Sequence, residues 1–139
     1  MIIFVFGSNL AGRHGAGDAL IAQRKHGAIY GQGEGLQGRS YGLPTKNEYI
    51  RSLPLAEIEK SVDRFLAFAR AHPELTFDIA AVGCRLAGYT PAEVAPFFRD
   101  APSNCYLHPE FASVLRTLGL PAQEGPPPAA PPAQGQFGF

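Results

Sequence analysis

Two side chains in this sequence have the chemistry and the position of reacting groups: Lys46 and Asp18. Lys46 follows a short extended stretch, Ser40–Leu43, and in open α/β sheets ligands bind beyond the carboxyl ends of the strands. Asp18 lies in the first turn of an expected helix, where the helix dipole keeps a carboxylate ionised. A lysine and a carboxylate in one pocket can act as nucleophile and general base. The alternative for Lys46 is an ordinary solvated lysine in a turn.

A glycine-rich loop leads to Asp18, between an apolar strand expected at residues 2–6 and a helix expected at 16–25. Glycines let the backbone approach a ligand closely, and a helix start adds unpaired N–H groups, which together suit phosphate or carboxylate. The candidate ligand-binding residues of this loop are Gly7, Ser8, Asn9, Arg13, His14, Gly15, Ala16 and Gly17. A tight strand-to-helix turn that needs glycine for geometry alone explains the same loop.

A second loop of this kind follows a central strand expected at residues 75–82. Thr90 and Glu93 have the spacing of a capping box, and Pro91 suits the first helical position, so we expect a helix that runs to about Phe98. The second loop therefore also opens a helix start that suits an anion. Its candidate ligand-binding residues are Gly83, Cys84, Arg85, Leu86, Ala87, Gly88 and Tyr89.

Further elements complete an α/β pattern. Apolar residues spaced by three and four predict a helix over 55–71, residues 104–107 predict a strand, and residues 109–117 predict a helix capped by Gly119. A long glycine-rich surface loop with a short strand at 28–30 is expected between residues 27 and 42. The stretch Gly33–Gly38 matches the dinucleotide pattern G-x-G-x-x-G, but extended residues and Pro44 follow it, so no nucleotide-binding helix is expected there.

Composition narrows the classes of function. The chain has 139 residues, 45% of them hydrophobic, and equal numbers of acidic and basic side chains, so we expect one domain without a broad nucleic-acid face. The sequence shows no apolar run of membrane-spanning length and no charged leader, and its two cysteines suggest a reduced, cytoplasmic setting. The scattered histidines predict no metal site. Residues 1–120 are predicted to form the domain, and the proline-rich residues 121–139 a disordered tail.

Three stretches together resemble the macrodomain superfamily: Arg13–Ala19, Leu43–Lys46 and Val82–Tyr89. Their order and spacing are most similar to the terminal ADP-ribose protein glycohydrolase type and to short, phage-associated macro-like proteins. The resemblance covers roughly residues 2–118. It implies a three-layer α/β/α fold with a mostly parallel or mixed central sheet that binds ADP-ribose, free or attached to a macromolecule. No cofactor is implied, and we expect a monomer.

The resemblance also implies roles for single residues. The first loop, at Gly15, Ala16 and Gly17, would lie beside the distal ribose, and the second would wrap the diphosphate through its backbone N–H groups. Lys46 matches a lysine that attacks the anomeric carbon of that ribose. The aspartate that resolves the intermediate in those relatives is replaced here by Ala87, which leaves Asp18 for the acid–base role. Arg85 stands where a glycine is expected.

The leading interpretation is thus an ADP-ribosyl hydrolase acting on protein or nucleic acid. Its main alternative is a non-catalytic reader of ADP-ribose or of another NAD-derived nucleotide, which Ala87 favours. A third is an interaction protein whose tail, ending in Phe137 and Phe139, docks a partner. Two rival roles for site residues are a nucleophilic thiol at Cys84 and an acid–base or phosphate-contacting His14.

Overall fold

A five-stranded mixed sheet forms the centre of the protein in the computed structural model, which describes residues 1–129. β1 lies in the middle of the order β2-β3-β1-β4-β5, parallel to both of its neighbours. β5 runs parallel to β4, and only β2 is antiparallel to its neighbour β3. The strands are β1 (Ile2–Asn9), β2 (Gly35–Gln37), β3 (Ser40–Lys46), β4 (Thr76–Ile79) and β5 (Cys105–Tyr106). The expected α/β class and mixed sheet are confirmed.

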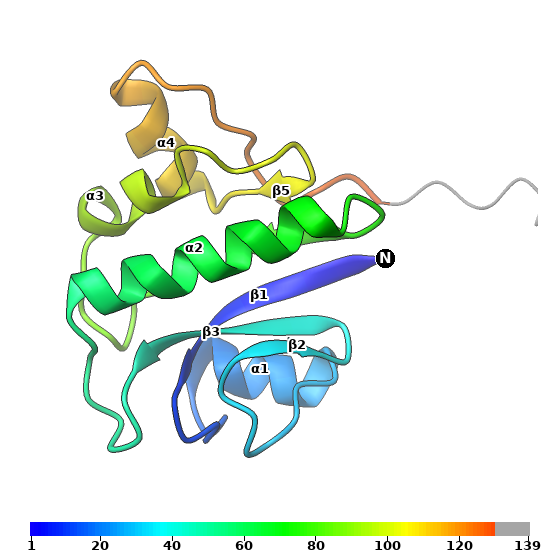
Figure 1. The fold of residues 1–139 in the computed structure, drawn as a ribbon, viewed down its shortest axis with the longest axis vertical. Coiled ribbons are helices and arrows are strands. Elements are labelled where there is room, and N and C mark those ends of the chain that lie inside the picture. Colours follow the sequence, from blue (N-terminus) through cyan, green and yellow to red (C-terminus); the bar gives the residue numbers. More distant parts are fainter. Residues whose placement is uncertain (130–139) are drawn as a thin grey trace, which may run out of the picture.

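Side chains of β1 alternate between the two faces of the sheet, as the period of a strand requires. Ile3 and Val5 join the larger core, which includes the buried face of α2 (Leu55–Ala71). Phe6 packs with Ala19 and Ala22 of α1 (Gly17–Lys25) on the other face. Helices therefore cover both faces, with α2 in front of the sheet and α1 behind it in Figure 1.

The helices follow the predicted patterns closely. The apolar stripe of α2 is buried along its length, at Ile58, Val62, Phe65, Leu66 and Ala69. α3 (Pro91–Val94) continues as a single 3₁₀ turn, η1 (Ala95–Phe98), and α4 (Pro109–Thr117) ends before Gly119. The Thr90–Glu93 capping box is present in both directions, which confirms that prediction.

The glycine-rich segment before β3 differs from its prediction. Residues 28–30 form no strand, whereas residues 35–37 pair with β3 as β2. Gly38 takes a φ of 61° in the connecting turn, and a Cβ there would lie 2.5 Å from the Gly27 carbonyl oxygen. Glycine thus serves a hairpin turn here, and no helix follows the G-x-G-x-x-G match, as expected.

The packed part of the chain extends past the predicted boundary at residue 120. The Leu107 amide donates to the Gln123 carbonyl at 2.8 Å, and the Gly125 amide donates to the Leu107 carbonyl at 2.7 Å. Arg116 and Glu124 form an ion pair at 2.8 Å. The proline content of this segment suggested a tail. Composition does not reveal that the exposed sheet edge near β5 leaves the backbone groups of Leu107 open to pairing with such a segment. The proposed tail tip, Phe137 and Phe139, lies outside the described residues.

Among the helices of residues 1–129, none has the length and apolar character needed to span a bilayer.

Candidate functional site

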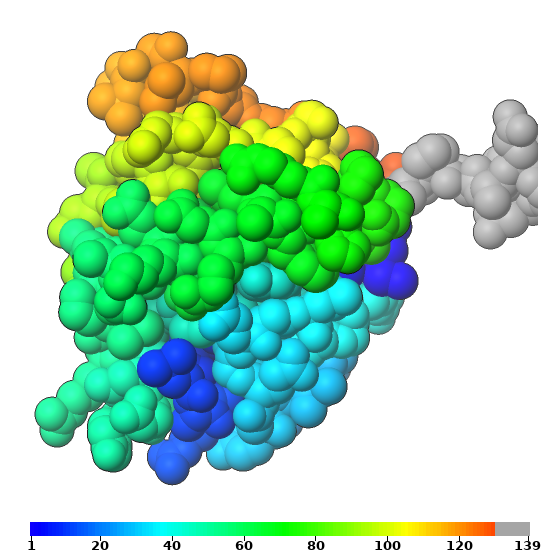
Figure 2. Space-filling model, viewed as in Figure 1, coloured from blue at the N-terminus to red at the C-terminus, as the bar shows by residue number. Residues whose placement is uncertain are grey.

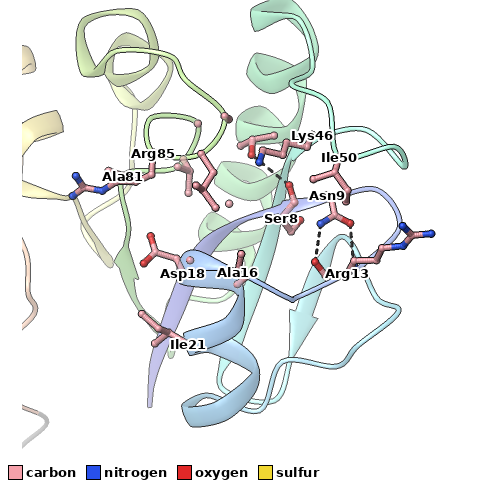
Figure 3. A pocket seen from close by; sticks show the side chains of 18 residues that line it. Ser8, Asn9, Arg13, Ala16, Asp18, Ile21, Lys46, Ile50, Ala81 and Arg85 are labelled. Atoms are coloured by element: carbon pink, nitrogen blue, oxygen red, sulfur yellow. Dashed lines mark hydrogen bonds between the residues drawn. The ribbon is translucent and has the colours of Figure 1, made fainter.

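A cavity of about 310 Å³ lies at the carboxyl ends of β1 and β3 and over the residues that follow β4 (Figure 3). This is the edge of a parallel sheet at which ligands bind in open α/β folds. Most of the predicted site residues line it, from both glycine-containing loops. They are Gly7, Ser8, Asn9, Arg13, Ala16, Gly17, Asp18, Lys46, Gly83, Arg85, Leu86 and Ala87.

Buried polar side chains at the end of β1 fix the first loop. Asn9 accepts a hydrogen bond from the Arg13 amide and donates one to the Arg13 carbonyl, both at 2.9 Å. The Ser8 hydroxyl donates to the Gly33 carbonyl. A Cβ at Gly33 would lie 2.5 Å from the Asn9 carbonyl oxygen, so only glycine permits this close approach. The side-chain hydrogen bonds of Ser8 and Asn9 therefore fix the conformation of the first loop.

The start of α1 is open toward the cavity. Its N-cap residue, Ala16, has no side chain that could accept a hydrogen bond from the first turn. The amides of a first helical turn have no intrahelical partner, and here they belong to Gly17, Asp18 and Ala19, which line the cavity. This end of α1 can therefore donate hydrogen bonds to an anionic or carbonyl-bearing ligand.

The second loop offers donors of its own. The amides of Cys84, Gly88 and Tyr89 bond to carbonyls within or next to the loop. Within residues 1–129, the amides of Arg85, Leu86 and Ala87 have no hydrogen-bond acceptor. The start of α3, by contrast, is occupied by its capping box. The expectation that both loops present a helix start to a ligand is therefore right for the first loop only.

Asp18 and Lys46 lie on opposite sides of the cavity, Asp18 beside Arg85 and Lys46 beside Ser8 (Figure 3). The structure records no ion pair between Asp18 and Lys46. Lys46 is the last residue of β3, and its backbone carbonyl accepts the Leu10 amide at 3.0 Å. The sheet thus fixes the backbone of Lys46, and its side chain lines the cavity on the side opposite Asp18.

The remaining predicted residues lie outside this cavity. His14 is fully buried, where its Nε2 pairs with Gln37 Oε1 at 3.1 Å and its ring meets Phe6 edge-on. Its predicted acid–base and phosphate-contacting roles are not supported, because it cannot reach the ligand space. Gly15 and Gly88 are exposed on the loops. The Tyr89 hydroxyl donates to the Leu53 carbonyl at 2.7 Å and ties the second loop to the segment before α2.

Cys84 does not suit a thiolate nucleophile. Burial, with a smaller contribution from the nearby Glu110 carboxylate, raises the pKa of its thiol to about 11. A thiol with this pKa stays protonated at neutral pH and is a poor nucleophile. Cys84 packs against the main core and does not line the cavity.

Sequence reasoning missed several lining residues, chiefly Thr45, Ile21 and Ile50. The Thr45 hydroxyl donates to the Ser8 carbonyl at 3.3 Å, which braces β3 against β1 below the cavity. Ile50 has a φ of 63°, a strained conformation for a β-branched residue. It lies in the segment between β3 and α2, which projects from the surface beside the end of β1 (Figure 2). No sequence signal marks an isoleucine for that role.

A second cavity, of about 260 Å³, adjoins the first. The two share Asp18, Ala81 and Arg85 as lining residues. Asp78 of β4 faces the second cavity, where burial is the main cause that raises the pKa of its carboxyl group above the ordinary value. An extended ligand could therefore occupy both cavities and cross the shared wall.

Replacing Asp78 by asparagine is expected to raise the melting temperature at pH 7. The raised pKa means that the folded protein binds more protons than the unfolded chain between the two pKa values, so stability falls as pH rises through that window. Asparagine removes this charge penalty. The gain in melting temperature should vanish below the ordinary carboxyl pKa, where Asp78 is protonated in both the folded and the unfolded state. Thermal unfolding from pH 3 to pH 8 measures it, with the exposed Asp63→Asn as the matched control. A lower melting temperature for Asp78→Asn at pH 7 would contradict the prediction.

No group of three or more metal-ligating side chains gathers anywhere in the described part of the chain. Comparison with known proteins adds no assignment, since no protein-family model, no curated protein and no solved structure matches the chain.

Proposed function

We propose that this protein binds ADP-ribose in the cavity at the carboxyl ends of β1 and β3, and hydrolyses ADP-ribosyl linkages there. The observation that carries the proposal is the pair of facing loops with unpaired backbone donors, Gly17–Ala19 and Arg85–Ala87. Such amides suit the oxygens of phosphate and ribose. The resemblance of the same loops to macrodomains supports ADP-ribose as the ligand.

The shape of the site suits a long ligand. ADP-ribose has its diphosphate in the middle, and the wall shared by the two cavities contains Arg85 and adjoins the free amides of the second loop. With the diphosphate at that wall, the distal ribose would lie in the first cavity. There it would sit between Lys46 and Asp18, with Ala16 and Gly17 beside it.

The opposed positions of Lys46 and Asp18 suit a double displacement. In the first step, the Lys46 amine attacks the anomeric carbon, a carbon–nitrogen bond forms, the bond from that carbon to the acceptor breaks, and the acceptor leaves with a proton from the amine. In the second, a water molecule on the Asp18 side attacks the same carbon. Its proton passes to Asp18, the carbon–nitrogen bond breaks, and the nitrogen takes up a proton from the solvent while Asp18 releases one to it, so that both side chains are regenerated as ADP-ribose is released. The net reaction consumes one water molecule for each linkage cleaved.

A second candidate function is a reader that binds ADP-ribose without turnover. Ala87 favours it, because a methyl group lines the cavity where the similar glycohydrolases carry an aspartate. In that case Lys46 and Asp18 would only contact the ribose. Release of ADP-ribose from a modified protein or modified DNA distinguishes the two functions.

ADP-ribose is expected to stabilise the fold strongly. A ligand that binds only the folded state at about 100 times its dissociation constant adds roughly 2.7 kcal/mol to the free energy of unfolding. Thermal unfolding with and without ADP-ribose measures this, and free ribose at the same concentration is the control ligand. A melting temperature that stays the same in millimolar ADP-ribose would contradict both candidate functions.

A further inference from the structure

We propose that the Arg85 guanidinium group binds the diphosphate of the ligand, and that Glu110 of α4 holds this group while the site is empty. The inference rests on the proposed function and names the side chain that recognises its charged centre. Arg85 takes the place of a glycine expected from the resemblance, so the contact would be a feature of this chain.

Position supports the proposal first. Within residues 1–129, Arg85 is the only lysine or arginine that lines both cavities. Arg13 and Lys46 line the first cavity alone. A diphosphate that crosses the shared wall therefore has one side-chain cation within reach from both sides.

The present contacts of Arg85 are weak. Its Nη2 lies 3.8 Å from Glu110 Oε1, beyond hydrogen-bond distance, and the side chains are 64% and 49% exposed. Exposed ion pairs of this kind contribute little to stability. A diphosphate offers several oxygens that a planar guanidinium can bind in bidentate fashion. The ligand should therefore displace the glutamate easily.

The groups around Arg85 bear on how an anion would bind there. The amides of Arg85, Leu86 and Ala87 have no acceptor among the described residues, so the backbone beside this side chain offers further donors to an anion. Asp18, which also lines both cavities, presents a carboxylate to the same space. A phosphate near Asp18 would meet like charge, and Arg85 is placed to offset it.

Calorimetric titration with ADP-ribose and with inorganic pyrophosphate tests the inference. Arg85→Ala is expected to weaken the binding of both by roughly 10-fold or more, as for a lost hydrogen bond to a charged group. Arg24→Ala removes the same charge from the last turn of α1, away from both cavities, and should stay within about two-fold of wild type. Glu110→Gln should bind ADP-ribose more tightly, by up to about five-fold, since an exposed competitor is lost.

The outcomes separate the two proposals. If wild type binds ADP-ribose and Arg85→Ala binds it equally well, the Arg85 inference is overturned while the proposed function stands. An unchanged or weaker affinity for Glu110→Gln contradicts the role given to Glu110. Wild type that binds neither probe overturns both proposals. Because Arg85 is exposed, its replacement should leave the melting temperature unchanged, which unfolding without ligand verifies.

Discussion

Replacing Lys46 by alanine is expected to abolish release of ADP-ribose from a modified protein or modified DNA. The variant loses the amine that attacks the anomeric carbon in the proposed reaction. Binding of free ADP-ribose should remain largely intact, because in the proposed complex backbone donors of the loops and Arg85 would hold the diphosphate. Single-turnover release assays and calorimetry on the same preparations measure the two effects separately.

Asp18→Ala is expected to lower the same turnover by roughly 10² to 10⁴, the factor typical of a lost acid–base group. Asp18 also interacts favourably with the dipole at the start of α1, a contribution of about 0.3 to 1 kcal/mol to stability. Asp18→Asn shows whether hydrogen bonding without proton transfer retains any activity. Thermal unfolding shows whether the loss of turnover comes from the site or from the fold.

Two further variants, Lys46→Arg and Lys25→Ala, serve as controls for Lys46→Ala. Lys46→Arg keeps a cationic side chain but replaces the nucleophilic amine by a guanidinium, so it should bind and fail to turn over. Lys25→Ala removes a lysine that lines neither cavity and should retain wild-type turnover. Full activity in Lys46→Ala would show that the lysine mechanism is wrong. Tight binding without any turnover in wild type would make the protein a reader.

The sequence predicted the elements with strong local signals. α2 follows from its apolar periodicity, α3 from the Thr90–Glu93 capping box, and the site from two loops at strand ends. Parallel strands place their carboxyl ends on one edge, so the loops after β1 and β4 had to meet there. Lys46 and Asp18 were placed at one cavity by the same reasoning.

The features that the sequence did not reveal depend on contacts distant in the chain. His14 looked like a loop residue, yet its ring is buried against Phe6 and pairs with Gln37. Ile50 lines the cavity with a φ of 63°, a backbone conformation that no residue pattern predicts for an isoleucine. The short strand β2 consists of glycine, leucine and glutamine, which carry little strand preference, and forms because β3 offers a partner edge.

The pairing of residues 123–125 with Leu107, which follows β5, is the clearest case, since composition there favours a tail. Ending the chain after Leu120 is expected to lower the free energy of unfolding by about 3 to 5 kcal/mol. The estimate combines lost hydrogen bonds, at about 1 kcal/mol each, with exposure of apolar surface at Leu107. Leu107 is only 2% exposed in the intact fold, and its amide and carbonyl both bond to this segment.

A chain ending after Ala129 is the matched control, because it keeps the hydrogen bonds between this segment and Leu107. Urea unfolding of both truncations and of the full chain measures the difference, and the denaturant slope shows whether each still unfolds as one unit. The full loss in the free energy of unfolding should appear only in the chain that ends after Leu120. Glu124→Ala, which removes the Arg116 ion pair alone, should cost no more than about 1 kcal/mol, since that pair is exposed. Equal stability of the two truncations would show that the fold does not need the segment paired with Leu107, and that the domain ends at residue 120 as its composition suggested.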